Sequence, residues 1–366
     1  MWWWRSPREL FFVVAAPSQR RILSETTAVS CGDGGHTDPT MDGMSTGTAK
    51  PLAALATTPT GELEPTRCPA CGGPLGGTLL DSPDRLCGLP GTYSVARCQA
   101  CGLGVTLPVV DAARLASYYP TTYGAYELPI GILGRVSQAI QRLQSRQALR
   151  TAPLAHLAQL PVGRLLDVGC GRGDLGSWLI QRGWSVTGVE PSAQACTVAR
   201  DRGVDARMGT LTEVELEPAR YDAVVFRQSL EHVIDPVADL RRAREALRDR
   251  GVAIVSVPNF GCWQRRRFGE RWFHLDLPRH RVHFDENALR TTLARAGYAR
   301  VETCTSSSSV GLPASIQYAL AGRCLFRSGL RLRVAVAACA VMAPLAWLLD
   351  RLAGGGDVLH AVAYAR

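Results

Sequence analysis

The chain has 366 residues, 46% of them hydrophobic, which is enough for one large domain with accessories or for two domains. Its formal net charge is +9, but the arginines responsible are spread along the sequence rather than gathered in a basic run with interleaved aromatic residues. This distribution argues against a nucleic-acid partner. Only four of the 12 cysteines form C-x-x-C pairs, a pattern that indicates a reducing, cytoplasmic location rather than a disulfide framework.

Residues 1–62 differ in composition from the rest of the chain. The opening stretch MWWWRSPRELFFVVAAPSQRR contains apolar runs, but charged residues interrupt them, so the continuous apolar segment of a signal peptide is missing. The stretch that follows is rich in glycine, threonine and proline, which predicts disorder. We therefore expect a disordered leader without a function of its own, and a translation start at Met41 or Met44 is an open alternative.

Two C-x-x-C pairs lie within residues 63–108. Cys68 and Cys71 form the first pair, Cys98 and Cys101 the second, and a glycine follows each pair. Redox C-x-x-C motifs normally come singly at the start of a helix in a βαβ unit, and neither pair has that context. Four thiolates can instead coordinate one Zn²⁺ tetrahedrally, which leaves no open position for a catalytic water. The spacing predicts a small zinc-ribbon module with a structural metal ion.

Residues 109–160 are expected to be a linker and a helix. The tyrosine-rich stretch SYYPTTYGAYELP, residues 117–129, is irregular in pattern because proline and glycine interrupt it. It could line a substrate pocket or pack on the surface as a connector. The remainder of the linker has apolar residues at spacings of three and four, which predicts a helix.

From residue 161 to the C-terminus, short apolar strands alternate with amphipathic helices. The strands expected are RLLDV, SVTGVE, VDARM, YDAVVF and GVAIVSVP, and the helices lie near residues 174–183, 192–202, 233–249 and 285–297. This succession predicts an α/β fold with a parallel sheet and helices on both faces. Ligands of such sheets bind at the carboxyl ends of the strands.

The glycine-rich stretch LLDVGCGRGDLG, residues 165–176, can be read in two frames. Gly171-x-Gly173-x-x-Gly176 matches the fingerprint of dinucleotide sites, whereas Gly169-x-Gly171-x-Gly173 resembles the loop of S-adenosylmethionine (SAM) enzymes. We favour the second frame. Gly176 then serves close packing of the helix on the sheet.

The acidic residues around this loop decide between the frames. Asp167 ends the first strand and Asp174 opens the helix, so two carboxylates would repel a pyrophosphate. SAM carries an ammonium group and no phosphate, so a carboxylate at the strand end could anchor it. Glu190 ends the second strand, where an acidic residue accepts hydrogen bonds from both ribose hydroxyls.

Four motifs, carried in order by three stretches, resemble those of class I SAM-dependent methyltransferases. LLDVGCGRGDLGSWLIQRGWSVTGVEPS resembles motif I with the acidic second-strand motif, YDAVVFRQSLEHVIDP the fourth-strand motif and LRDRGVAIVSVPN the fifth strand. The resemblance covers about residues 164–297 and is greatest to the ubiquinone-biosynthesis-like group, in the branch with an N-terminal zinc ribbon. It implies a seven-stranded Rossmann-like sheet whose last strand runs antiparallel between the fifth and sixth.

The resemblance also implies which residues bind SAM. Residues after the third strand would border the adenine, and those after the fourth strand would lie beside the methionine part. The set expected to bind the cofactor is Asp167, Gly169, Cys170, Gly171, Gly173, Glu190, Pro191, Thr210, Leu211, Gln228 and Ser229.

Histidines near the carboxyl ends of the strands are the candidates for a general base. Methyl transfer from a sulfonium needs an aligned nucleophile and, for some acceptors, removal of its proton. We expect His280, and after it His283, to be catalytic, because their segment follows the fifth strand and resembles a stretch of sugar methyltransferases in which a histidine acts as base. His232 is expected to pack beside the cofactor. The arginines of CWQRRRFGERW could bind an acidic substrate or form a solvated loop.

Residues 310–356 are expected to be a helical insertion before the last strand. The 16 apolar residues at 334–349 are too few for a membrane span of about 20 residues. Two helices, near 312–326 and 330–352, would instead cap the site, make an oligomer contact or lie in a membrane interface. Peripheral membrane contact through residues 312–352 would indicate a lipid-linked acceptor, and the oligomeric state stays open.

The sequence thus predicts a SAM-dependent methyltransferase with a structural zinc ion. Its acceptor would be a hydroxyl or carbon of a small molecule, a sugar or a lipid-linked metabolite. The alternative is a cofactor-binding scaffold whose ribbon mediates protein or nucleic-acid contacts.

Overall fold

A computed structural model describes residues 55–57, 63–65, 67–110, 115, 117–119, 154–325 and 329–365 of the chain. The chain divides into two units, Met1–Ala49 and Lys50–Arg366, and the described residues all belong to the second. The expected disordered leader and most of the expected linker lie outside the described residues. The expected boundaries between ribbon, linker and methyltransferase domain stay predictions.

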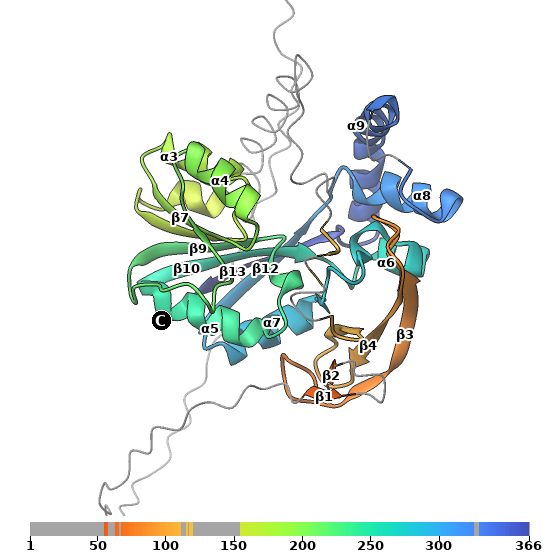
Figure 1. Ribbon diagram of the computed structural model, residues 1–366, viewed down its shortest axis with the longest axis horizontal. Coiled ribbons are helices and arrows are strands. Elements are labelled where there is room, and N and C mark those ends of the chain that lie inside the picture. The colour runs from red at the N-terminus through yellow and green to blue at the C-terminus, as the bar shows by residue number, and fades with distance from the viewer. Residues whose placement is uncertain are drawn as a thin grey trace, which may run out of the picture. The chain divides into compact units, whose positions relative to one another are not determined.

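A mixed seven-stranded sheet forms the centre of the second unit (Figure 1). Its strands, in spatial order, are β12 (Arg300–Ser306), β13 (Val358–Tyr364), β10 (Leu247–Pro258), β9 (Tyr221–Arg227), β6 (Arg164–Val168), β7 (Ser185–Glu190) and β8 (Asp205–Met208). The five strands from β10 to β8 run parallel, and β13 pairs antiparallel with both β10 and β12. The expected Rossmann-like sheet with an inserted antiparallel last strand is therefore confirmed.

Helices cover both faces of this sheet, as the alternating pattern predicts. The 3-10 helix η1 (Leu154–Gln159) and the helices α3 (Asp174–Ile180) and α4 (Ala193–Asp201) contribute to one apolar core, and α5 (Pro236–Ala246) and α7 (Glu286–Arg295) to the other. Three of these helices start at a capping side chain that accepts a hydrogen bond from the backbone N–H three residues later. The caps are Ser192, Asp235 and Asp285.

A second sheet contains the two C-x-x-C pairs. Its spatial order is β11-β5-β4-β3, with β3 (Leu75–Pro83), β4 (Thr92–Cys98) and β5 (Gly104–Leu107) from the ribbon segment. The fourth strand, β11 (Val282–His283), comes from the segment that follows the fifth strand of the large sheet. The ribbon is thus joined by backbone hydrogen bonds to the segment that carries the expected catalytic histidines. A separate two-stranded sheet is formed by β1 (Leu55–Thr57) and β2 (Leu63–Pro65).

Two helices lie between β12 and β13, as expected for the insertion. They are α8 (Gly311–Ala321) and α9 (Gly329–Leu352), and α9 contains Pro344. In the part of the chain that the structure describes, no helix combines the length and the apolar character needed to cross a membrane. The segment between β10 and α7 contains α6 (Trp263–Phe268), η3 (Gly269–Arg271) and η4 (Phe273–Leu275), and η2 (Leu230–His232) follows β9.

Candidate active site

The loop between β6 and α3 has three glycines with positive φ angles: Gly169 at 75°, Gly171 at 53° and Gly173 at 72°. A Cβ atom added to Gly169 would lie 2.5 Å from Cβ of Ser229, so no side chain fits there. A Cβ added to Gly171 would instead meet no atom within 4 Å. The loop is therefore closed on one side and open at Gly171, where a ligand can approach the backbone.

Gly176 serves helix packing rather than ligand binding. A Cβ there would lie 2.8 Å from Cγ2 of Val204 and 3.2 Å from Cγ1 of Val186, so α3 can approach the sheet only with glycine at this position. The role expected for Gly176 is confirmed. Cys170 also turns into the core, with its Sγ against Gly188, which leaves only its backbone on the loop.

Asp167 is a buried carboxylate beside this loop, with 3% of its surface exposed. Within the described residues its carboxylate accepts no hydrogen bond. Burial raises its pKa to about 6, the charge of Glu190 acts in the same direction, and Arg227 opposes the shift. Such a group gains most from a cationic ligand.

Asp174 is not the unpaired carboxylate that the sequence predicts beside Asp167. Its Oδ1 lies 2.5 Å from Nη1 of Arg202, and its Oδ2 lies 3.9 Å from Nη2 of Arg172. Because Asp174 is paired with arginine, the electrostatic case for a cationic ligand rests on Asp167 and Glu190.

Glu190 is bound to the backbone of the loop. Its two carboxylate oxygens accept hydrogen bonds from the backbone N–H groups of Gly171 at 3.0 Å and Ser192 at 2.9 Å. Burial raises the pKa of Glu190, and these two hydrogen bonds lower it. Each oxygen keeps a second lone pair that can accept from a ribose hydroxyl.

The remaining residues expected to contact the cofactor follow β7, β8 and β9. Gln228 has a φ angle of 54°, a left-handed conformation that is uncommon for a residue with a side chain and is often found at functional sites. The hydroxyl of Ser229 donates to the carbonyl of Val168 at 2.6 Å and ties this turn to the glycine loop. Thr210 is exposed, Leu211 lies in the core, and Pro191 follows Glu190 on the surface.

Glu231 and His232, which follow Ser229 closely in sequence, form a cluster with His280. One donor atom from each side chain lies within 4.8 Å of the other two, and the two imidazole rings are 4.7 Å apart. Burial lowers the pKa of His232 and, together with the neighbouring histidines, lowers that of His280 well below its usual value. Burial raises the pKa of Glu231 to about 8. The sequence-based expectation for His232 was packing only, and the structure places it with His280.

His283 has a different setting from His280. Its Nε2 lies 3.0 Å from the hydroxyl of Thr106, its ring packs against Phe260, and burial lowers its pKa to about 3. These contacts hold β11 against the ribbon strand β5. A catalytic role for His283 stays a prediction, and its contacts favour a structural one.

Arg279 connects the ribbon to this cluster and was not singled out from the sequence. Its side chain is fully buried and donates to Asp84 at 2.6 Å and to both oxygens of Asp276. Its carbonyl oxygen lies 3.0 Å from Nδ1 of His232. No local pattern signals this pair, because Asp84 and Arg279 are 195 positions apart.

Two further sequence features have clear environments. The hydroxyl of Tyr119 lies 3.1 Å from Nδ1 of His232, so the start of the tyrosine-rich stretch contacts the site, and residues 120–129 lie outside the described residues. The arginines of the α6 segment bind local groups: Arg265 and Arg266 donate to the backbone carbonyls of Phe260 and Gly261. This arrangement favours a loop stabilised by its own contacts over an anion-binding site.

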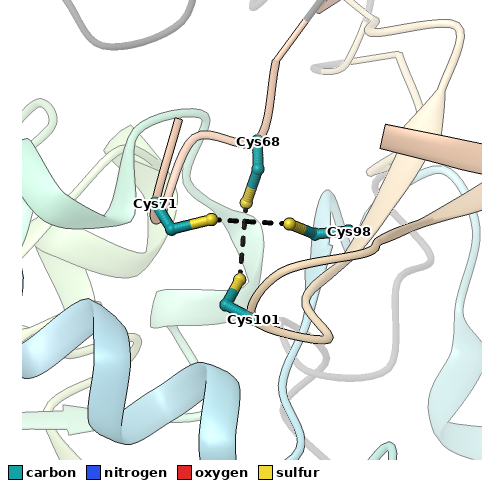
Figure 2. A group of neighbouring side chains, drawn as sticks. All are labelled: Cys68, Cys71, Cys98 and Cys101. Atoms are coloured by element: carbon teal, nitrogen blue, oxygen red, sulfur yellow. Dashed lines mark hydrogen bonds between the residues drawn. The ribbon is translucent and has the colours of Figure 1, made fainter. Parts of the chain in front are cut away.

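The four cysteines of the C-x-x-C pairs converge on one point (Figure 2). The sulfur atoms of Cys68 and Cys101 are 3.6 Å apart, and those of Cys71 and Cys98 are 3.4 Å apart. Sulfur atoms bound tetrahedrally to Zn²⁺ at about 2.3 Å would lie about 3.8 Å apart. The residues therefore fit a zinc ion with little movement.

The two halves of this four-cysteine site have the same backbone design. The first cysteine of each pair accepts, through its carbonyl, a hydrogen bond from the glycine four residues later, Gly72 or Gly102. Both glycines have positive φ angles. The same turn is thus built twice, and each turn directs two sulfur atoms to the shared centre.

Comparisons with known proteins agree with this geometry. Residues 137–303 match a family described as a methyltransferase domain. The ubiquinone biosynthesis O-methyltransferase of Azorhizobium caulinodans is 35% identical over 133 residues, which are 35% of this chain and 50% of that protein. The enzyme of the same name from Methylobacterium sp. (strain 4-46) is 30% identical over 170 residues, 42% of this chain and 66% of that protein. The chain spans about half the length of the first of these relatives.

A solved structure of phosphoethanolamine N-methyltransferase 2 from Haemonchus contortus is 17% identical and covers 71% of this chain and 61% of its own, with a TM-score of 0.46. Because that score is low, the assignment rests on the chain's own strand order, glycine loop and sequence matches. These show that the chain contains a class I SAM-dependent methyltransferase domain.

Proposed function

We propose that this protein transfers a methyl group from SAM to a hydroxyl or carbon atom of a small-molecule, sugar or lipid-linked acceptor. The observation that carries the proposal is Asp167, a buried carboxylate without a hydrogen-bond partner among the described residues, next to a loop that is open at Gly171. An ammonium group would supply the missing charge at that position.

SAM would lie across the carboxyl ends of β6, β7 and β9. Its ammonium group would bind Asp167, its ribose hydroxyls would bind Glu190, and its methionine part would pass over Gly171. The other residues proposed to line the cofactor are Gly169, Cys170 and Gly173 through their backbone, and Pro191, Thr210, Leu211, Gln228 and Ser229.

The acceptor would approach from the side of Glu231, His232 and His280. The turn that begins at Ser229 brings this cluster close to the glycine loop, so an acceptor held there can face the methyl group. We propose His280 as the residue that activates the acceptor, since its Nδ1 is fixed by a backbone carbonyl while no hydrogen bond engages its Nε2 in the described structure. In the displacement, the acceptor atom forms a bond to the methyl carbon as the carbon–sulfur bond breaks, and the electron pair of that bond remains on sulfur.

The four-cysteine site is proposed to hold a structural zinc ion. With four thiolate ligands it offers no coordination position to a substrate. Its role would be to fix the ribbon sheet, which the β5–β11 pairing connects to the segment carrying His280.

Among the three acceptor classes, the inserted helices α8 and α9 support a lipid-linked acceptor. Large apolar side chains on α9 are exposed, among them Val341 at 80% and Leu352 at 75%, together with Trp347. Such a face can lie in a membrane interface, cap the site or contact another copy of the chain. Co-sedimentation with anionic liposomes tests the membrane role. The wild type should sediment with the liposomes, and a Trp347→Ser variant should remain in the supernatant. Wild-type protein that does not sediment excludes the membrane role.

Calorimetric titration with S-adenosylhomocysteine (SAH) and with NAD tests the cofactor assignment. We expect SAH to bind and NAD not to bind, and radiolabelled SAM should label a component of lipid or soluble extract fractions. Binding without any transfer would favour the alternative, a cofactor-binding scaffold whose ribbon contacts a protein or nucleic acid. A protein that binds neither ligand would contradict both interpretations.

A further inference from the structure

Glu231 is the feature of the cluster that the methyl-transfer proposal leaves unexplained. Only 1% of its surface is exposed, and neither carboxylate oxygen has a hydrogen-bond partner from another residue in the described parts of the chain. A buried carboxyl group without partners costs about 1–3 kcal/mol even when its raised pKa keeps it protonated, because its polar atoms lose their hydrogen bonds to water. A bound cation would offset this cost.

The two neighbouring histidines have the orientation typical of metal ligands. Nδ1 of His280 lies 2.9 Å from the carbonyl oxygen of His274, and Nδ1 of His232 lies 3.0 Å from that of Arg279. A carbonyl can only accept, so Nδ1 of each ring carries the proton and Nε2 keeps its lone pair. Nδ1 of His232 also lies 3.1 Å from the hydroxyl of Tyr119, whose oxygen then accepts from the same N–H. Metal-binding histidines almost always donate their other ring N–H to such a partner, which fixes the tautomer and the ring.

The three side chains also converge. One donor atom of each lies within 4.8 Å of the others. Ligands bound to one ion at about 2.1 Å lie at most about 4.2 Å apart, so small side-chain rotations close the site. Among the described residues, one further acidic group forms an ion pair with this cluster: Oδ2 of Asp276 lies 3.9 Å from Nε2 of His280. That oxygen already accepts a hydrogen bond from Arg279.

We propose that Glu231, His232 and His280 bind a divalent transition-metal ion, in a site separate from the four-cysteine site. Two imidazoles and one carboxylate suit Mn²⁺, Fe²⁺ or Zn²⁺, whereas four thiolates suit Zn²⁺ or iron and do not suit Mn²⁺. Three protein ligands leave coordination positions open. This inference rests on the proposed function in one respect: an acceptor oxygen would fill an open position, and the ion would make its proton more acidic. With Nε2 of His280 on the ion, that residue would activate the acceptor as a metal ligand rather than by taking the proton itself. The proposed site therefore selects acceptors that offer an oxygen atom.

Manganese titration followed by electron paramagnetic resonance tests the site on the full chain with its cysteines intact. The signal of free Mn²⁺ falls as the ion binds, so we expect one tight Mn²⁺ per chain in the wild type. Glu231→Gln and, separately, His232→Gln should weaken binding by at least about tenfold, as losing a ligand does. The matched control Glu217→Gln, at an exposed glutamate that pairs with Arg220, should bind like the wild type.

The outcomes separate this site from both the zinc and the cofactor. In protein loaded with Mn²⁺, the zinc held by the four-cysteine site should stay at one ion per chain in each variant by mass spectrometry, and SAH affinity should change little. Wild-type protein without a Mn²⁺ site, or a Glu231→Gln variant that binds Mn²⁺ as the wild type does, overturns the metal proposal. If SAH binds and methyl transfer occurs in that case, the proposed function survives; if SAH does not bind while Mn²⁺ does, the proposed function fails and the metal site stands.

Discussion

Replacing Asp167 by asparagine should stabilise the protein and weaken cofactor binding at the same time. In the wild type the ionised carboxylate is buried without a hydrogen bond among the described residues, and its pKa rises from 3.8 to about 6. Asparagine has nearly the same shape and no charge. The substitution therefore removes an electrostatic cost of the folded state together with the proposed anchor of the SAM ammonium group.

The pKa shift sets the size and the pH window of the stability effect. The folded-state pKa lies above the unfolded one, so the folded state is penalised as the carboxylate ionises between pH 4 and pH 6, and the penalty is constant above that. A shift of about two units at about 1.4 kcal/mol per unit gives roughly 3 kcal/mol. The advantage of Asp167→Asn should be close to zero at pH 4 and largest from pH 7 upward.

Binding should change in the opposite direction. A hydrogen bond between charged groups contributes about 1.5–3 kcal/mol, which corresponds to a loss of roughly ten- to 150-fold in SAH affinity at pH 7.5. Chemical denaturation at pH 4.5 and pH 8, with calorimetric SAH titration, measures both effects on the same samples.

Asp174→Asn is the matched control, since Asp174 follows the same loop but pairs with Arg202. It should bind SAH almost normally and gain no stability at high pH. The reasoning is refuted if Asp167→Asn binds SAH as tightly as the wild type, or if it is less stable than the wild type at pH 8.

Three further predictions concern packing and the ribbon. Asp84→Asn removes one of the two carboxylates that bind the buried Arg279, while Asp276 still pairs with it, and should cost about 1.5–3 kcal/mol in the free energy of unfolding, measured by denaturation; a cost below 1 kcal/mol would contradict a role for the Asp84–Arg279 pair in joining ribbon and site. Gly176→Ala should cost about 1–3 kcal/mol through overpacking, whereas Gly171→Ala should cost about 1–2 kcal/mol of backbone strain and mainly reduce SAH affinity; equal effects of the two on SAH affinity would show that the glycine frame is misassigned. Cys98→Ser should lose the single zinc ion found by mass spectrometry and lower the melting temperature, and a variant that keeps its zinc would exclude the four-cysteine site.

Local sequence features predicted most of the fold. The alternation of apolar strands and amphipathic helices predicted the sheet, and the helices expected near 174–183, 192–202, 233–249 and 285–297 correspond to α3, α4, α5 and α7. The loop proposed to bind the cofactor could be found in the same way, because its glycines and acidic residues are neighbours in sequence.

The cluster proposed to face the methyl acceptor could not be predicted from local sequence features. Glu231 and His280 are 49 positions apart, and the choice of His280 over His283 depends on which ring faces Glu231 and which faces Thr106. The fully buried Arg279 likewise gains its meaning from Asp84, in a different part of the chain.

The sequence by itself thus predicted the alternation of strands and helices in an α/β methyltransferase domain, the glycine frame of the proposed cofactor loop and the two C-x-x-C pairs. Each of these features depends mainly on residues a few positions apart, whose backbone preferences and chemistry act locally, whereas the strand order was implied by the family resemblance. Only the tertiary structure decided that the ribbon sheet takes its last strand from the segment of the histidines, and that Glu231 is buried beside two imidazoles with free Nε2 atoms. Burial and long-range pairing create these properties, because the same side chains in water would be hydrated, separate and without a shared ligand.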